Sequence, residues 1–195
     1  KFMECNHGIV SMDHRLKGLL RFKEQDIPFH SGRGYIEKDW GSSFPSAYVW
    51  MQSNHFEEDS ISFKCSVATI PMLGTGFTGF ICGLYVRGAF IRFTTYNFSR
   101  IKMLIQTDSG IELELINPRF QLTVKATNGQ TALLASPIQG AMEGRISESM
   151  TASLFIRLVQ RKTASVVFEG HGKHAGLEIA GAFDELLKAH KKGRK

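Results

Sequence analysis

The sequence is poor in cysteine and proline and carries no disulfide or low-complexity signature. Its 195 residues include three cysteines at unrelated spacings, and five prolines beside 19 glycines. An odd set of three cysteines makes no disulfide framework, and the spacings fit no zinc ribbon. A hydrophobic fraction of 43% excludes a disordered chain. These features predict a single domain over residues 1–195, with reduced thiols that are typical of a cytoplasmic protein.

The sequence also lacks a run that reads as a transmembrane helix. The segment from Cys65 to Val86 has no charge over 22 residues, yet only 13 of them are apolar. Pro71 and several glycines interrupt it, whereas a spanning helix needs about 20 mainly apolar residues. Two strands joined by a turn at Pro71–Gly76 explain this composition better, so we expect at most peripheral contact with a membrane.

Excess positive charge is nearly absent from the body of the chain. The formal net charge is +6, but five cations without an acid lie in residues 188–195, which leaves +1 for residues 1–187. The strand-like segments have no basic run interleaved with stacking aromatics, so we expect no nucleic-acid partner. The tail can complement the end of a preceding helix or approach an anionic membrane.

The sequence does not support any of the usual motifs for a cofactor, a metal or a catalytic nucleophile. Gly74–Gly79 matches G-x-G-x-x-G, but strand-like residues follow it, and the next acid is Asp108. His171 and His174 flank a glycine-rich turn rather than a firm scaffold for a metal. No G-x-S-x-G nucleophile elbow is present. The sequence therefore predicts neither a metal nor a cofactor.

Alternation of apolar and polar residues, with a period of two, is the dominant pattern in the sequence. From Arg145 to Leu158, one set of alternate residues is apolar except for Glu148, and the other set is mostly polar. Turn signals such as Asp108-Ser109-Gly110 and Gly170-His171-Gly172 separate many similar runs. This pattern predicts an all-β fold, an antiparallel barrel or sandwich. One helix is expected at the C-terminal end, where apolar spacing is helical at Phe183, Leu186, Leu187 and His190.

Polar and aromatic residues are most concentrated in residues 34–45 and 48–56. In strand geometry one face carries Tyr35, Glu37 and Asp39, with Trp40 beside them, and another carries Tyr48, Trp50, Gln52 and Asn54. Pairing of these strands across the Gly41–Pro45 turn would place two carboxylates beside an indole. Acids and amides rarely enter a core unpaired, so the mixture suits a barrel lumen that holds a ligand. The alternative is an outward polar face, with Trp50 covering one end of the barrel.

These residues resemble the tocopherol cyclase-like family, which is related to lipocalin-like carotenoid hydratases. The resemblance rests on Gly34–Pro45, G-Y-I-E-K-D-W-G-S-S-F-P, and on W-x-Q-x-N at Trp50–Asn54. Further blocks that carry it are Met3–Gly8, Ser11–His14, Phe93–Tyr96, Ser136–Pro137, Gly140–Met142, Ile146–Ser149 and Ala175–Ile179. It implies a lipocalin-like barrel. Family members usually have a comparable upstream stretch, so we expect this chain to be the C-terminal half of a longer protein, with an upstream domain as a partner.

The resemblance implies a cofactor-free cyclisation, in which a prenyl double bond is protonated and a quinol oxygen captures the cation. Such chemistry needs a neutral buried carboxylic acid and aromatic faces near the cation. Asp39 or Glu37 would be the acid, and Glu148 is a second candidate that could equally be a structural carboxylate. Tyr35, Tyr48 and Trp50 would form the aromatic wall, and Gln52 and Asn54 would orient a polar head group. His7 and His14 could shuttle a proton, or be ordinary hydrogen-bonded strand histidines.

Three functions remain open on the sequence. The first is binding of a lipophilic prenylquinol-like or polyene molecule, with cyclase-like or hydratase-like catalysis. The second is a non-catalytic carrier or sensor for the same class of ligand. The third is a structural domain in which the polar residues only close one end of a barrel.

Overall fold

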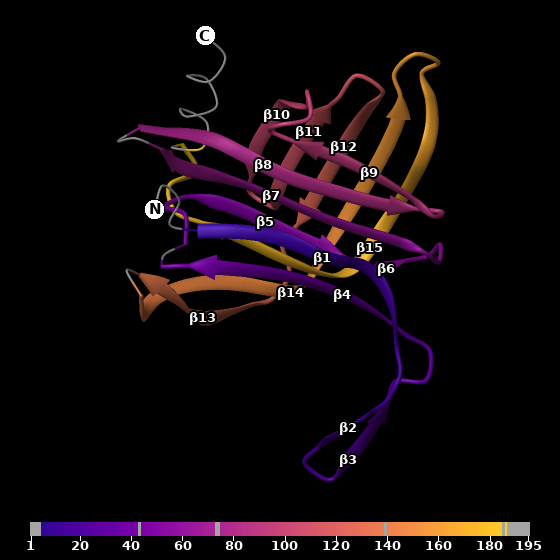
Figure 1. The fold of residues 1–195 in the computed structure, drawn as a ribbon, viewed down its shortest axis with the longest axis vertical. Coiled ribbons are helices and arrows are strands. Elements are labelled where there is room, and N and C mark those ends of the chain that lie inside the picture. The colour runs from indigo at the N-terminus through magenta and orange to yellow at the C-terminus, as the bar shows by residue number, and fades with distance from the viewer. Residues whose placement is uncertain (1–4, 43, 73–74, 139, 185, 187–195) are drawn as a thin grey trace.

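The computed structural model describes residues 5–42, 44–72, 75–138, 140–184 and 186, and its elements are all strands. They are β1 (Cys5–Leu16), β2 (Leu19–Phe22), β3 (Gln25–Pro28), β4 (Gly32–Gly41), β5 (Tyr48–Ser53), β6 (His55–Phe56), β7 (Ile61–Met72), β8 (Thr75–Val86), β9 (Ala89–Thr94), β10 (Arg100–Thr107), β11 (Gly110–Ile116), β12 (Phe120–Thr127), β13 (Thr131–Ile138), β14 (Ala141–Gln160) and β15 (Ser165–Ala180). The all-β prediction is therefore confirmed. Figure 1 shows one large sheet, with the β1–β4 pair beside it and the small β2–β3 ribbon extending away.

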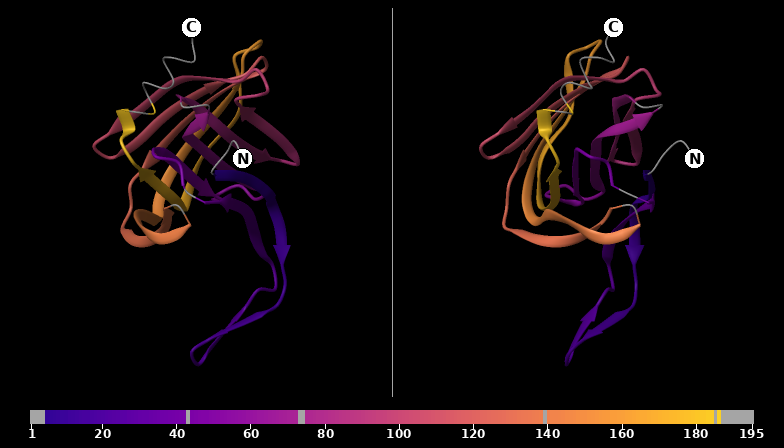
Figure 2. Two further views of the ribbon diagram at one scale, coloured as in Figure 1. Left: turned by 60° about the vertical axis from the view of Figure 1, so that its left-hand side comes forward. Right: turned by 90° about the vertical axis from the view of Figure 1, so that its left-hand side faces the viewer.

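The large sheet has 11 strands and does not close into a barrel. Its order is β10-β11-β12-β14-β15-β5-β7-β8-β9, with β13 added to β14 and β6 added to β15. Within the described residues the end strands β10 and β9 do not pair, so the predicted closed, lipocalin-like barrel is wrong. Strands β14 and β15 span 20 and 16 residues with several register shifts. Such bulges bend long strands, and the sheet coils until its two ends face each other without joining (Figure 2).

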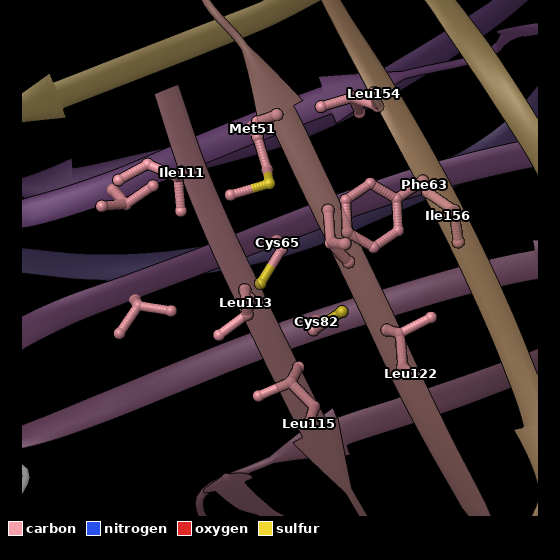
Figure 3. Packing of buried hydrophobic residues seen from close by; sticks show 14 of the residues in the cluster. Met51, Phe63, Cys65, Cys82, Ile111, Leu113, Leu115, Leu122, Leu154 and Ile156 are labelled. Carbon is pink, nitrogen blue, oxygen red and sulfur yellow. The ribbon is translucent and has the colours of Figure 1, made fainter. Parts of the chain in front are cut away.

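The core lies between these two facing parts of the sheet. Figure 3 shows Met51, Phe63, Cys65 and Cys82 from β5, β7 and β8 packed against residues of β11, β12 and β14, whose strands cross them steeply. Leu113, Leu122 and Ile156 on the second side are fully buried. Apolar side chains thus fill the space that would have been the barrel lumen. The interior of the coiled sheet is thus a packed core, and ligand binding by the residues assigned to the lumen stays a prediction.

Most of the local predictions from turn signals agree with the structure. The uncharged segment forms the β7–β8 hairpin, and Gly110 begins β11 directly after the Asp108–Ser109 turn. The predicted turn at Gly170–Gly172 is wrong, because these residues pair with β14 inside one continuous β15. The irregularity lies just beyond, at the bulge near His174, whose φ is 48°.

The hairpin expected across Gly41–Pro45 is also wrong. Strand β4 pairs with β1, whereas β5 pairs with β15 and β7, so the two polar strands belong to different sheets.

The C-terminal helix is not established. Leu187 and His190 lie outside the described residues, and no helix stands among the elements of the described part. The same part contains no helix that is long and apolar enough to cross a bilayer.

Candidate functional site

A pocket of about 700 Å³ lies on the face of the large sheet that points away from the core. Strand alternation explains its position, because Val49 and Met51 of β5 are buried in the core while Tyr48 and Trp50 point to the other side. The β1–β4 pair covers this second face. The lining residues are Cys5, His7, Glu37, Asp39, Phe44, Pro45, Tyr48, Trp50, Ser66, Ala68, Ile70, Phe77, Gly79, Phe80, Ile81, Thr95, Tyr96, Glu148 and Glu178.

The pocket has an apolar part and a polar part. Phe44, Ile70 and Phe77 belong to the apolar part, where the rings of Phe44 and Tyr48 meet edge to face at 5.9 Å between centroids. Four carboxyl groups define the polar part, and no lysine or arginine is among the lining residues that the structure describes. Such a cavity accommodates a mainly apolar molecule with a polar head.

Glu37 connects the covering pair to the large sheet. Its Oε1 accepts a hydrogen bond from the Trp50 indole at 2.5 Å, and its Oε2 accepts one from the Tyr35 hydroxyl. The structure therefore brings Glu37 beside the indole, although through two facing sheets rather than a hairpin. Burial, followed by the hydrogen bond to Glu37, raises the pKa of Tyr35, so this phenol stays protonated and donates.

Lys64 lies beneath this group and was missed at the level of sequence. Its side chain is fully buried, and its Nζ donates to Ser66 Oγ at 2.6 Å and lies 3.8 Å from Glu37 Oε2. Burial lowers the pKa of Lys64, and the charge of Glu37 opposes that effect. The signal was available, since Lys64 is the one charged residue on the alternate face of β7 opposite Phe63 and Cys65.

His7 joins Lys64 to Asp39 at the rim. Lys64 Nζ contacts His7 Nε2, which leaves the Nδ1–H of the ring to donate to Asp39 Oδ1. Ligand atoms of His7, Glu37 and Asp39 lie within 4.8 Å of one another, a spacing that a metal ion could use. The Lys64 amine already occupies this group, since its Nζ contacts His7 and lies 3.8 Å from Glu37 Oε2. The cluster is thus a hydrogen-bonded chain from the buried amine to the pocket rim.

Glu178 is a partly buried carboxyl of the pocket that sequence reasoning also missed. In the sheet register it lies between Glu148 of β14 and Trp50 of β5, and it accepts a 2.8 Å hydrogen bond from the Tyr48 hydroxyl. Burial raises the pKa of Glu178 to about 7, the hydrogen bond from Tyr48 opposes this, and the charge of Glu148 adds to it. A lone acid in the apolar run Ala175–Ala180 is the same signal that singled out Glu148.

Close packing around Trp50 depends on a glycine in the neighbouring strand. A Cβ on Gly176 would lie 2.5 Å from the Trp50 ring, so only glycine lets the indole lie over β15. Burial also raises the pKa of Tyr48, which therefore remains a donor to Glu178.

The structure separates the sequence-predicted residues into two groups. His7, Glu37, Asp39, Tyr48, Trp50 and Glu148 line the pocket, and Tyr35 reaches it through Glu37. The remaining candidates do not line it, although Gln52 lies opposite Lys64 in the β5–β7 register. Trp40 is 52% exposed with Lys38 over its ring, and His14 bonds Ser11 at 3.0 Å. Asn54 lies between β5 and β6, outside the lining.

Fold and site together define an all-β protein with an acid-bearing apolar pocket between a coiled sheet and a covering strand pair. The sequence profile of the tocopherol cyclase-like family matches residues 3–181, and the chain belongs to this family. The resemblance found in the Gly34–Pro45 block is thereby confirmed.

Two curated relatives resemble the chain at low sequence identity. The chain is 21% identical to "Tocopherol cyclase, chloroplastic" of Zea mays and 20% identical to "Probable tocopherol cyclase, chloroplastic" of Oryza sativa subsp. japonica. Each alignment covers 92% of this chain and 40% of the relative, so the chain spans less than half of their length. No solved structure matches the chain.

Proposed function

We propose that the pocket binds a lipophilic prenyl- or polyene-type molecule and protonates one of its C=C bonds. The observation that carries this proposal is the Glu178 carboxyl, whose pKa of about 7 keeps much of it protonated at neutral pH beside an apolar wall. A neutral carboxylic acid in such a place can act as a general acid. The family membership, and the names of the two relatives, agree with this chemistry.

The reaction balances without a cofactor. The Glu178 O–H bond breaks as its proton forms a C–H bond at the less substituted alkene carbon, which leaves a tertiary carbocation and a carboxylate. A phenolic oxygen of the same molecule attacks the cation, and its proton returns to the carboxylate, so the product is an isomer of the substrate. If water attacks instead, the product is a tertiary alcohol.

The surrounding side chains suit the charge that develops. The indole of Trp50 and the ring of Phe44 offer aromatic faces to a cation. Tyr48 stays protonated and holds the Glu178 carboxyl by its 2.8 Å hydrogen bond. Asp39, with His7 behind it, is placed at the rim to accept a hydrogen bond from a phenolic head group. Glu37, with both oxygens already accepting hydrogen bonds, acts as a positioning residue for Trp50 in this scheme.

The test uses the present chain with a methylated hydroquinone that bears a prenyl chain, in D₂O under a reducing atmosphere. We expect a chromanol as a single enantiomer. It should carry one deuterium on the ring CH₂ that neighbours the carbon of the new C–O bond. Glu178→Gln should abolish turnover and keep ligand binding. The matched control is Glu169→Gln on the same strand, where the carboxylate is half exposed and pairs with Arg157 at 3.3 Å. Unchanged turnover in Glu178→Gln would refute the acid.

A non-catalytic carrier for the same ligands is the second candidate. The apolar lining favours it independently of the acid, because binding requires only the pocket. Saturable binding of a prenylated quinol to the wild-type chain, with no product formed by that chain, would establish the carrier instead.

A further inference from the structure

The β2–β3 ribbon is a separate part of the described chain, and neither of its strands pairs with any other strand. The two strands form their own sheet, and all eight of their residues are exposed. Figures 1 and 2 show the ribbon extending away from the body, as a continuation of β1 and β4. Since β1 and β4 also carry the lining residues of the pocket cover, the ribbon is continuous with the candidate site.

The ribbon has two chemically different faces. Leu20 pairs with Ile27 in the register, and Phe22 follows two residues after Leu20, so these three side chains share one face. They are 51%, 40% and 60% exposed for Leu20, Ile27 and Phe22 respectively. On the other face Arg21 and Asp26 form a two-pronged ion pair at 2.5 and 2.8 Å, next to the exposed pair of Leu19 and Pro28 at the base of the ribbon. The charged pair is thus confined to one face, and the face of Leu20, Phe22 and Ile27 is apolar except for Gln25 and open to solvent.

Unpaired positive charge lies at the base and at the tip of the ribbon. Residues 15–33 hold five lysine and arginine residues against two acids. Among the described residues no carboxylate pairs with Arg15 or Lys17 at the base of the ribbon, or with Lys23 at its tip. Lys23 Nζ lies 5.5 Å from the centroid of the Phe22 ring, so a cation and an aromatic group are presented together. Glu24 is the unpaired acid of the ribbon.

We propose that the β2–β3 ribbon docks the protein on an anionic lipid surface, with its apolar face at the headgroup boundary and Lys17 and Lys23 among the headgroups. An isolated two-stranded hairpin is marginally stable in water, so an apolar surface that covers one face would also stabilise it. Aliphatic and aromatic side chains flanked by cations are the composition that binds such surfaces reversibly.

The size of the apolar face argues for lipid rather than for a second protein. A stable protein interface buries roughly 800 Å² on each partner, involving about 20 residues a side. Three apolar side chains on a narrow ribbon are far fewer, whereas a few inserted side chains with basic residues are sufficient for a bilayer interface. The proposal agrees with a lipophilic ligand for the pocket, since such a ligand resides in a membrane, but docking does not depend on catalysis.

The test measures flotation of the full chain with vesicles of phosphatidylcholine, pure or mixed in equal parts with phosphatidylglycerol. We expect binding to the anionic vesicles, and a loss of about tenfold or more in Leu20→Asp/Phe22→Asp, because insertion and charge attraction are both weakened. The matched control is Leu133→Asp/Met150→Asp, which removes two exposed apolar side chains of β13 and β14 and adds the same charge. This control should bind like the wild type.

Several outcomes would overturn the proposal. Equal binding of the two double variants would place the contact elsewhere, and absence of wild-type binding to either vesicle would refute docking. Loss of binding on deletion of residues 191–195 alone would assign it to the basic tail. A dimer that Leu20→Asp/Phe22→Asp dissociates, without vesicle binding, would indicate a second copy as the partner. Turnover and binding of a short-chain prenylated quinol in vesicle-free buffer report on the proposed function separately.

Discussion

Replacement of the Glu178 carboxyl by an amide should make the protein more stable at alkaline pH. Glu178→Gln keeps the shape of the side chain, and its carbonyl oxygen can still accept the hydrogen bond from Tyr48. What it removes is the charge that the wild type must bury between Trp50 and Glu148 when the carboxyl ionises. The effect therefore depends on pH in a way that an ordinary packing change would not.

The expected size follows from the pKa of Glu178, which is about 7 in the folded protein against an ordinary value of 4.5. This difference corresponds to about 3 kcal/mol, which we reduce to about 2 kcal/mol because part of the side chain is open to solvent. The folded state binds the proton more tightly than the unfolded state, so wild-type stability is highest below about pH 4.5 as far as this group is concerned. It falls as the pH rises to 7 and levels off above it.

The measurement is urea denaturation of the wild type and of Glu178→Gln at matched pH values between about 5 and 8.5. The variant should gain stability relative to the wild type as the pH rises, with most of the gain below pH 7.5. Glu169→Gln, whose carboxylate is exposed, should show no such trend. If the free energies of unfolding of Glu178→Gln and of the wild type differ by a constant amount across this range, the raised pKa of Glu178 is refuted.

Four further results are expected. Turnover of a prenylated quinol should decline as the pH rises through about 7, since the proposed proton donor is the protonated form of Glu178, and a rate that is flat with pH would argue against this acid. Lys64→Met should lower the free energy of unfolding by about 3 kcal/mol, because Glu37 loses its nearby cation, and Lys64→Met/Glu37→Gln should recover part of the loss in urea melts. Gly176→Ala should weaken ligand affinity about tenfold by calorimetric titration while the fold persists by circular dichroism, since the new methyl group would displace the Trp50 indole. Deletion of residues 191–195 should leave ligand affinity unchanged in the same titration.

The strands were accessible from the sequence, but the closure of the sheet was not. Alternation along Arg145–Leu158 and the Asp108–Gly110 turn report local backbone geometry, and both predictions agree with the structure. Whether the edge strands β9 and β10 meet depends on the summed twist and bulges of the strands between them, which no local pattern records. The continuous β15 illustrates this, because pairing with β14 overrides the turn preference of Gly170 and Gly172.

The residues of the site were easier to predict than the strands that bring them together. The alternation of β4 and β5 correctly indicated that Glu37 and Trp50 face a common space, and they form a hydrogen bond. The sequence could not show that they approach from different sheets, because non-adjacent strands become neighbours only through the fold. Lys64 and Glu178 were missed although each is a lone charged residue on its strand face, because only the fold shows their partners: Glu37 of the covering pair for Lys64, and Glu148 of the neighbouring strand for Glu178.

Strand β5 serves two compartments at once, and this constrains how the family can change. Val49 and Met51 pack in the core, whereas Tyr48 and Trp50 form part of the pocket wall. Each of these side chains therefore contacts only one side of the sheet. A deletion or insertion of one residue here would send methionine into the pocket and an indole into the interior. Sequence drift in β5 must therefore proceed by substitution within each alternate set, and the two sets can diverge independently. The packing of the core and the shape of the pocket can be tuned separately on the same short strand.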